Sequence, residues 1–272
     1  MLDVHSHVPE NRFRSIYSLV PPRGFCPEAG VCYSLGIHPW VETEFRQGLF
    51  CSLEELEALA ARPEVCAVGE AGLDRLHRPL PDLPPGCLHE VQAEASAAEP
   101  EAWRKSVELL ERQARLAERV GKPLVLHCVK AVDDILALQG RLRPQVPWIF
   151  HGFRGNPQQA CQLVRRGICL SLGERFPAAT ACAIPVAQLL VETDESRLPI
   201  DEILLRVAAA RYGALPEKGP HFSEKGQGVF PKTAVPSPAR AGGGLSQDDA
   251  FRDFADMLRM ELEHNVRRLF GV

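Results

Sequence analysis

Short apolar runs alternate with longer stretches of helical periodicity along this chain. The apolar runs are rich in residues that favour strands, and the alternation of strand and helix is typical of an α/β fold with a parallel sheet. The eight strands that the pattern predicts are residues 1–5, 14–19, 32–37, 65–69, 123–127, 147–151, 168–172 and 188–193.

Helix boundaries are marked by local signals. Ser52 and Glu55 form a capping box, with Ser52 as N-cap and Glu55 at the third helical position. Residues 101–120 carry apolar side chains at helical spacing, and Gly121 and Pro123 end that helix. Further helices are predicted over residues 131–141, 156–166, 201–212 and 248–267.

Three stretches depart from regular strand–helix alternation. Residues 8–31 are too short for a strand, a full helix and two turns, so we expect one outer helix to be missing near the N-terminus. Residues 76–99 are rich in Pro, Ala and Glu and predict an inserted loop, and residues 213–247, with several Gly and Pro, predict a flexible insertion. We expect residues 1–272 to form a single domain carrying these insertions.

Potential metal ligands follow the apolar runs. The carboxyl ends of the strands of a parallel barrel lie on one face, so ligands that are far apart in the sequence would meet there. Four imidazoles and two carboxylates are enough for two divalent ions that share a bridging carboxylate. The six candidates are His5, His7, Glu70, His127, His151 and Asp194.

Each candidate also has a simpler interpretation. His5 and His7 point the same way in an extended segment and can reach one ion, with Asp3 placed to orient one of them, but they could also be surface or capping histidines. Glu70 could be a solvated loop residue, and Asp194 could cap a helix. His127 and His151 could each be a core or loop histidine. Because all six candidates fall at predicted strand ends, the set as a whole favours a metal site.

Composition limits the class of protein. The chain has 272 residues, is 45% hydrophobic and has a formal net charge of −4, which argues against nucleic-acid binding through a broad basic surface. Bound cations could still hold phosphates locally. Nine cysteines without a CxxC pair predict reduced thiols in a cytoplasmic protein. We expect no signal peptide and no membrane span, because no apolar run approaches roughly 18 residues.

The chain resembles the TatD-like metal-dependent hydrolases, a branch of the amidohydrolase superfamily. The resemblance implies a distorted (β/α)8 TIM barrel. The matching segments follow one another in order over nearly the whole chain: residues 3–7, 36–39, 69–74, 123–127, 151–155, 192–194 and 265–270.

The resemblance also implies a site with two divalent cations per subunit, which would be Mg, Mn or Zn. The imidazole-rich ligand set favours Zn or Mn over Mg, although the family points partly to Mg. Glu70 would bridge the two ions. His5, His7 and Asp194 would complete one ion's ligands, and His127 and His151 the other's.

Catalysis would be metal-assisted hydrolysis. The ions would lower the pKa of a water and polarise the scissile group, and Glu70 and Asp194 would be the catalytic carboxylates, with Asp194 accepting the proton of the water. His38, Lys130 and Arg154 lie near predicted strand ends and are candidates for substrate contact, or else a packing histidine and two surface charges. Lys130 stands where the family usually has arginine, which keeps the charge but loses bidentate phosphate geometry.

The function that these residues predict is hydrolysis of phosphodiester bonds in DNA, in the manner of a 3′ exonuclease. An alternative is an ester or amide hydrolase of the same superfamily, such as a D-aminoacyl-tRNA deacylase or a small-molecule amidohydrolase. A binding protein that retains a metal site is a third possibility, against which the complete ligand set argues. We expect nucleic acid (DNA, RNA or tRNA) as substrate, with no membrane and no obligate protein partner.

Overall fold

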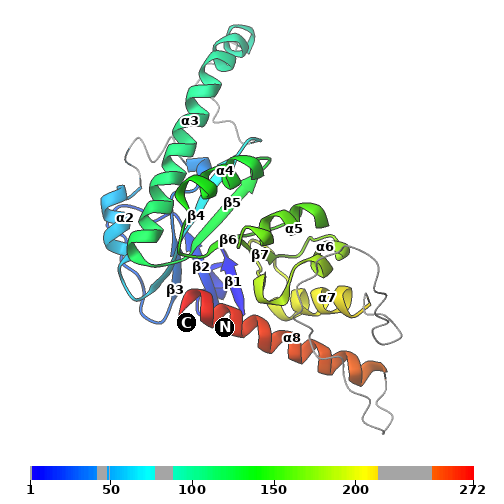
Figure 1. Cartoon of the computed structure of the whole chain (residues 1–272). Helices are drawn as coiled ribbons and strands as arrows, with labels where there is room; N and C mark the ends of the chain where they lie inside the picture. The colour runs from blue at the N-terminus through cyan, green and yellow to red at the C-terminus, as the bar shows by residue number, and fades with distance from the viewer. Residues whose placement is uncertain (1, 42–47, 49, 77–87, 214–246) are drawn as a thin grey trace. The chain divides into compact units, whose positions relative to one another are not determined.

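The computed structural model describes residues 2–41, 48, 50–76, 88–213 and 247–272, with side chains for all of these except 88–100 and 247. Eight parallel strands follow one another in the order of a closed barrel, as the fold prediction requires (Figure 1). They are β1 (Asp3–Ser6), β2 (Ser15–Leu19), β3 (Cys32–Leu35), β4 (Val65–Asp74), β5 (Leu124–Val129), β6 (Trp148–Phe150), β7 (Cys169–Leu172) and β8 (Leu189–Val191).

Two compact units make up the chain: residues 5–151, and residues 1–4 together with 152–272. In the first unit, strands β2 to β6 pair with their neighbours in parallel register. Helices α2 (Leu53–Ala60), α3 (Leu88–Val120) and α4 (Val132–Leu142) belong to this unit. The expectation of a single domain stays a prediction.

The capping box predicted for α2 is confirmed. The Ser52 hydroxyl oxygen accepts a hydrogen bond from the Glu55 backbone N–H at 3.1 Å, and the Glu55 carboxylate accepts one from the Ser52 N–H at 2.6 Å. At the other end of the helix, the Lys122 ammonium donates to the carbonyls of Ala60 and Arg62 at 2.6 and 2.7 Å. Both ends of α2 therefore have partners for backbone groups that the helix itself leaves unpaired.

The missing outer helix is also confirmed. Residues 7–14, which join β1 to β2, contain only a short 3-10 helix, η1 (Pro9–Asn11). Residues 20–31, which join β2 to β3, are described throughout and contain no helix either. Two successive connections are thus shorter than the strand–helix–strand unit of a regular barrel.

The predicted loop at 76–99 is wrong over its second half, because α3 already begins at Leu88. Residues 88–99 are rich in Ala and Glu, which have high helix propensity, and this composition lets the helix begin well before Pro100. The first half of that loop, 77–87, and nearly all of the insertion predicted at 213–247 lie outside the described residues. Gly213 itself ends helix α7 (Ile200–Gly213), and helix α8 (Gln247–Phe270) begins at Gln247.

Strand β4 is twice as long as predicted, and it places Glu70 inside the strand rather than after it. The prediction ended the strand at Gly69, but all ten residues through Asp74 are buried. The register of β4 with β5 shifts between Val68 and Ala71, and pairing then continues to the end of both strands. Added Cβ atoms at Gly69 and Gly72 would clash with the backbone oxygens of Val125 and His127, so only glycine permits this close approach of β5.

In the second unit, β7 pairs with β8, and Asp3 of β1 pairs with Val191 of β8. Helices α5 (Pro157–Arg165), α7 and α8 match the prediction, whereas the six-residue α6 (Ala178–Ala183) was not predicted. The buried Asn265 amide of α8 donates to the carbonyls of Val186 and Leu189, at 2.7 and 3.1 Å, and so fixes α8 to the start of β8. No helix in the described parts of the chain combines the length and the apolarity needed to cross a membrane.

Gln113 of α3 holds the chain that leaves β3. Its buried amide accepts a hydrogen bond from the Ile37 N–H at 2.7 Å and donates to the Ile37 carbonyl at 3.0 Å. Gln113→Glu should lower the free energy of unfolding by about 1–3 kcal/mol, because a carboxylate oxygen would replace the donor that faces this carbonyl. Urea denaturation measures the change. The neighbouring exposed Arg112→Gln serves as control and should stay within about 0.5 kcal/mol of the parent; equal stability of the two variants would contradict the assignment.

Candidate metal centre

Five of the six predicted ligands lie in residues 5–151, and the structure brings them together around one carboxylate. The Nε2 atoms of His5 and His7 lie 3.4 and 3.1 Å from Oε2 of Glu70. The other oxygen, Oε1, lies 2.7 Å from Nδ1 of His127 and 2.6 Å from Nε2 of His151. Residues from β1, β4, β5 and the end of β6 therefore meet at Glu70, as the strand-end pattern predicts.

Glu70 is almost completely buried, with 4% of its surface exposed, and His5 is fully buried. Burial by itself would raise the pKa of Glu70, but the imidazoles of His151, His127 and His38 that contact it hold that pKa well below its usual value. Glu70 is therefore an ionised carboxylate in a site with little water. A buried charge of this kind requires compensating positive charge nearby.

The hydrogen bonds of His7 determine which of its nitrogens faces Glu70 with a lone pair. Nδ1 of His7 lies 2.9 Å from the Ser18 backbone oxygen, and a carbonyl can only accept, so Nδ1 carries the proton. In a neutral His7, Nε2 then points a lone pair at Oε2 of Glu70, 3.1 Å away. Two acceptors face each other there, and a cation between them would satisfy both.

His127 is arranged in the same way through its other nitrogen. Nε2 of His127 lies 3.2 Å from the Asp74 carboxylate, which accepts, so Nε2–H is the donor and Nδ1 presents its lone pair to Glu70. A carboxylate that receives the second N–H of an imidazole is the usual support of a metal-ligating histidine. Nε2 of His151 lies 3.4 Å from this same Nδ1.

His38 faces Glu70 with a proton rather than with a lone pair. The backbone N–H of Trp40 donates to Nδ1 of His38 at 3.1 Å, so Nε2 carries the proton and donates to Oε1 of Glu70, also at 3.1 Å. Burial lowers the pKa of His38, which favours the neutral ring. His38 therefore acts as a hydrogen-bond donor in this site, whereas His7 and His127 offer lone pairs.

These donors fit divalent cations. One ligand atom from each of His5, His7 and Glu70 lies within 4.8 Å of the others. Imidazole nitrogens with a carboxylate oxygen suit zinc and manganese. The negative charge of Glu70 could also be compensated by protonating several of the clustered imidazoles. Those positively charged rings would then be buried side by side, which is unfavourable because they repel one another.

Asp74, Trp40 and Ser18 take part in the cluster although the sequence analysis assigned none of them a role. Asp74 accepts a hydrogen bond from the indole N–H of Trp40 at 2.8 Å in addition to its contact with His127. Asp74 stands four residues after Glu70 in one strand, so the two side chains share a face. The alternation of side chains along a strand would therefore have identified Asp74 if β4 had been predicted to its full length.

Asp194, the sixth predicted ligand, belongs to the other unit. It follows β8, is half-buried and has a left-handed backbone with φ of 53°. The residue before it is held firmly, because the Thr193 N–H and hydroxyl donate to the two carboxylate oxygens of Asp3 at 3.0 and 2.7 Å. Asp3 therefore fixes the backbone that leads into Asp194.

The two predicted basic contacts are exposed. Lys130 directly follows β5 and has a left-handed φ of 53°. Arg154 lies between β6 and α5, in the second unit.

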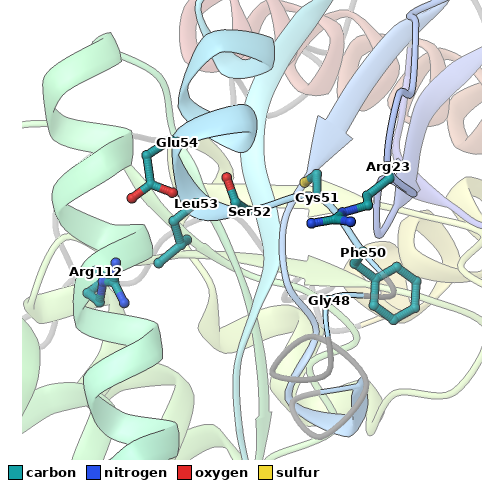
Figure 2. Close-up of a pocket in the computed structure, with 8 residues that line it drawn as sticks. All are labelled: Arg23, Gly48, Phe50, Cys51, Ser52, Leu53, Glu54 and Arg112. Atoms are coloured by element: carbon teal, nitrogen blue, oxygen red, sulfur yellow. The ribbon is translucent and has the colours of Figure 1, made fainter.

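A pocket between Arg23 and Arg112, at the N-terminus of α2, contains none of the predicted site residues (Figure 2). It is therefore separate from the cluster around Glu70.

Comparison with known proteins identifies similar chains. The profile of the family described as TatD related DNase matches residues 27–199, which include Glu70, His127, His151 and Asp194 but neither His5 nor His7. An uncharacterized metal-dependent hydrolase of Haemophilus influenzae is 29% identical over 178 residues, covering 62% of this chain and 61% of the relative. A 3′-5′ ssDNA/RNA exonuclease TatD of Citrobacter rodentium is 30% identical, covering 60% and 57%.

These matches span about three-fifths of the length of the curated relatives. Among solved structures, YjjV, a TatD homologue from Escherichia coli, aligns with a TM-score of 0.64 at 22% identity, covering 99% of this chain and 97% of that one. A TatD family hydrolase of Entamoeba histolytica aligns with a TM-score of 0.59 at 14% identity. These two alignments agree with the barrel fold.

Asp74→Asn should weaken binding of a divalent cation about 10- to 100-fold, because the amide no longer fixes the Nε2–H tautomer of His127. Competition with a chromophoric chelator measures the affinity. Asp134→Asn is the matched control, since Asp134 is a carboxylate that pairs with Arg75 at 2.8 Å rather than with a histidine of the cluster. Unchanged affinity in Asp74→Asn would refute the role given to Asp74.

Proposed function

The chain belongs to the TatD related DNase family, and from this premise we propose that it is a metal-dependent hydrolase that cleaves phosphodiester bonds of DNA from the 3′ end. The observation that carries the proposal is the buried Glu70 carboxylate, which two histidines face with lone pairs. Relatives named as exonuclease or deoxyribonuclease support phosphodiester substrates, and relatives named as metal-dependent hydrolases support the broader class.

We assign the ligands of two ions as the resemblance implies. His5, His7, Glu70 and Asp194 would hold one ion, and Glu70, His127 and His151 the other, with Glu70 shared. The ions would be Mg, Mn or Zn, and when bound they would activate water and polarise the scissile phosphoryl group.

The chain's own groups carry the proton and orient the reactants. Asp194 accepts the proton of the attacking water as the new P–O bond forms and the bond to the 3′ oxygen breaks. His38 would contact the substrate by turning its Nε2–H from Glu70 to a substrate oxygen, while Lys130 and Arg154 would contact phosphates. Glu70, held ionised by its surroundings, keeps the ligands in place throughout.

The alternative substrate is an ester or amide, such as that of a D-aminoacyl-tRNA or a small molecule, because the same ligands serve either bond. Salt separates DNA from a small neutral substrate, but not from an aminoacyl-tRNA, which carries phosphates of its own. Contacts with several phosphates should make binding fall steeply as salt rises, whereas a small neutral substrate should show little salt dependence. Free thiols at all eight described cysteines agree with a cytoplasmic location, which we propose together with nucleic acid as partner.

Asp194→Asn should lower kcat on single-stranded DNA about 100- to 10,000-fold, because the amide cannot accept the proton of the water. Release of nucleotides from 3′-labelled DNA, with Mg, Mn or Zn added to chelator-treated protein, measures the rate. Glu195→Gln, the adjacent exposed carboxylate, is the control and should keep the parent rate. Absence of any DNA cleavage by metal-loaded parent protein would redirect the assignment to ester and amide substrates.

Lys130→Gly removes the side chain that we propose contacts a phosphate, and glycine can keep the left-handed backbone at this position. A non-glycine residue at φ of 53° is strained by about 1 kcal/mol, so the variant should be at least as stable as the parent. The slope of log KM against log salt should become shallower by about 0.7, the value expected for one phosphate contact on a single strand. Arg143→Gly is the control. It relieves similar backbone strain at the end of α4, where Arg143 has a left-handed φ of 49°, and it should leave the slope unchanged. Identical slopes in both variants would remove Lys130 from the site.

A further inference from the structure

Two cysteine side chains on neighbouring strands of the first unit lie in contact. Cys32 begins β3, and Cys66 is the second residue of β4. The register of the two strands shifts after Tyr33, which pairs with Val65, and Cys66 is the extra residue at this shift. A hydrogen bond joins the side chains of Cys32 and Cys66. The irregular pairing of β3 with β4 therefore brings two thiols together that are far apart in the sequence.

The two thiols differ in their access to solvent. Cys66 is buried, with 5% of its surface exposed, and its Sγ lies 3.4 Å from the Tyr33 carbonyl oxygen, to which its S–H can donate. Cys32 is only half-buried. A small solute can therefore reach Cys32, while Cys66 lies behind it within sulfur contact.

The contact between the thiols also decides which of them ionises. Donation from the Cys66 S–H lowers the pKa of Cys32 to about 7. The same hydrogen bond and burial raise the pKa of Cys66 well above its usual value, against a smaller opposing effect of the Lys122 ammonium. About half of Cys32 is thus a thiolate at neutral pH, whereas Cys66 keeps its proton.

This arrangement suits oxidation better than metal binding. Among the described residues, no further His, Cys, Asp or Glu completes a metal site with these two sulfurs. A reachable thiolate with a second thiol beside it is the arrangement that peroxides oxidise, because the second thiol can capture the first oxidation product.

We propose that Cys32 and Cys66 form a site of reversible oxidation, at which hydrogen peroxide converts the two thiols into a disulfide. The proposal is independent of the hydrolysis proposed above. Cys32 is the thiol that reacts with the peroxide, and Cys66 is the thiol that resolves the product. The disulfide would join β3 to β4 four residues before Glu70.

The reaction balances in two steps. The Cys32 thiolate attacks one oxygen of hydrogen peroxide, so that an S–O bond forms, the O–O bond breaks, and hydroxide leaves and takes up a proton as water. The Cys66 sulfur then attacks the sulfenic sulfur of Cys32, the S–S bond forms, and the S–O bond breaks. The second hydroxide leaves with the Cys66 proton as water. The two thiols together lose two electrons, which the peroxide gains.

The test exposes the full reduced chain, freed of reductant, to one equivalent of hydrogen peroxide at pH 7. Remaining thiols are alkylated with N-ethylmaleimide in urea and mapped by mass spectrometry. The parent should lose two of its nine alkylatable thiols, yield one peptide pair joined through Cys32 and Cys66, and regain both thiols with dithiothreitol. The reaction should be roughly 3- to 15-fold faster than that of an unfolded cysteine peptide, which is mostly protonated at this pH.

Three variants assign the roles. Cys66→Ser should leave Cys32 as a sulfenic acid that dimedone traps, because the resolving thiol is gone. Cys32→Ser should leave Cys66 reduced, because Cys66 is buried and protonated. Cys26→Ser is the matched control: it removes an exposed thiol of the same unit and should form the disulfide as the parent does.

The parent alone can overturn the proposal, so the test holds even if a variant fails to fold. Cys32 and Cys66 that both remain alkylatable while other thiols are oxidised would contradict it. Cys32 oxidised to a sulfinic acid with Cys66 still free would do the same, as would loss of the disulfide in Cys26→Ser. None of these measurements involves DNA, so failure of the proposed hydrolysis would be recognised separately.

Discussion

The buried negative charge of Glu70 is the constraint to which the rest of residues 5–151 is adapted. A carboxylate removed from water is stable only among groups that compensate it, and here imidazoles from β1, β5, the end of β6 and the segment after β3 surround it. Gly69 and Gly72 have no side chain, and this lets the β5 backbone approach β4 closely enough to bring His127 to the carboxylate. The fold and the site thus depend on the same strand.

The direction of each proton gives the cluster its chemical character. The Ser18 carbonyl accepts the N–H of His7, and the Asp74 carboxylate accepts the N–H of His127. Each of these imidazoles therefore directs the lone pair of its other nitrogen at Glu70. The Trp40 backbone N–H donates to Nδ1 of His38, so Nε2 of His38 carries the proton and acts as a donor. Identical side chains therefore have different roles, which their backbone and carboxylate partners set.

The sequence predicted all eight strands because strands buried in a parallel sheet are nearly continuous apolar runs. It also predicted that His5, His7, Glu70, His127 and His151 would meet, since ligands at the ends of parallel strands share one edge. It missed the second half of β4, where glycines resemble a turn, and with it Asp74. The contacts of Asp74 with Trp40 and His127 join residues 34 and 53 positions apart, and no local pattern encodes such contacts.

We propose that the lone pairs directed at Glu70 bind divalent cations. The most direct test is the number of divalent ions that the full chain retains at equilibrium, measured by elemental analysis after dialysis against Zn or Mn, for the parent and for Glu70→Gln. We expect about two ions per chain in the parent and loss of both in the variant, since Glu70 would be the shared ligand. A parent that retains no ion, or a Glu70→Gln variant that retains as many as the parent, would contradict it.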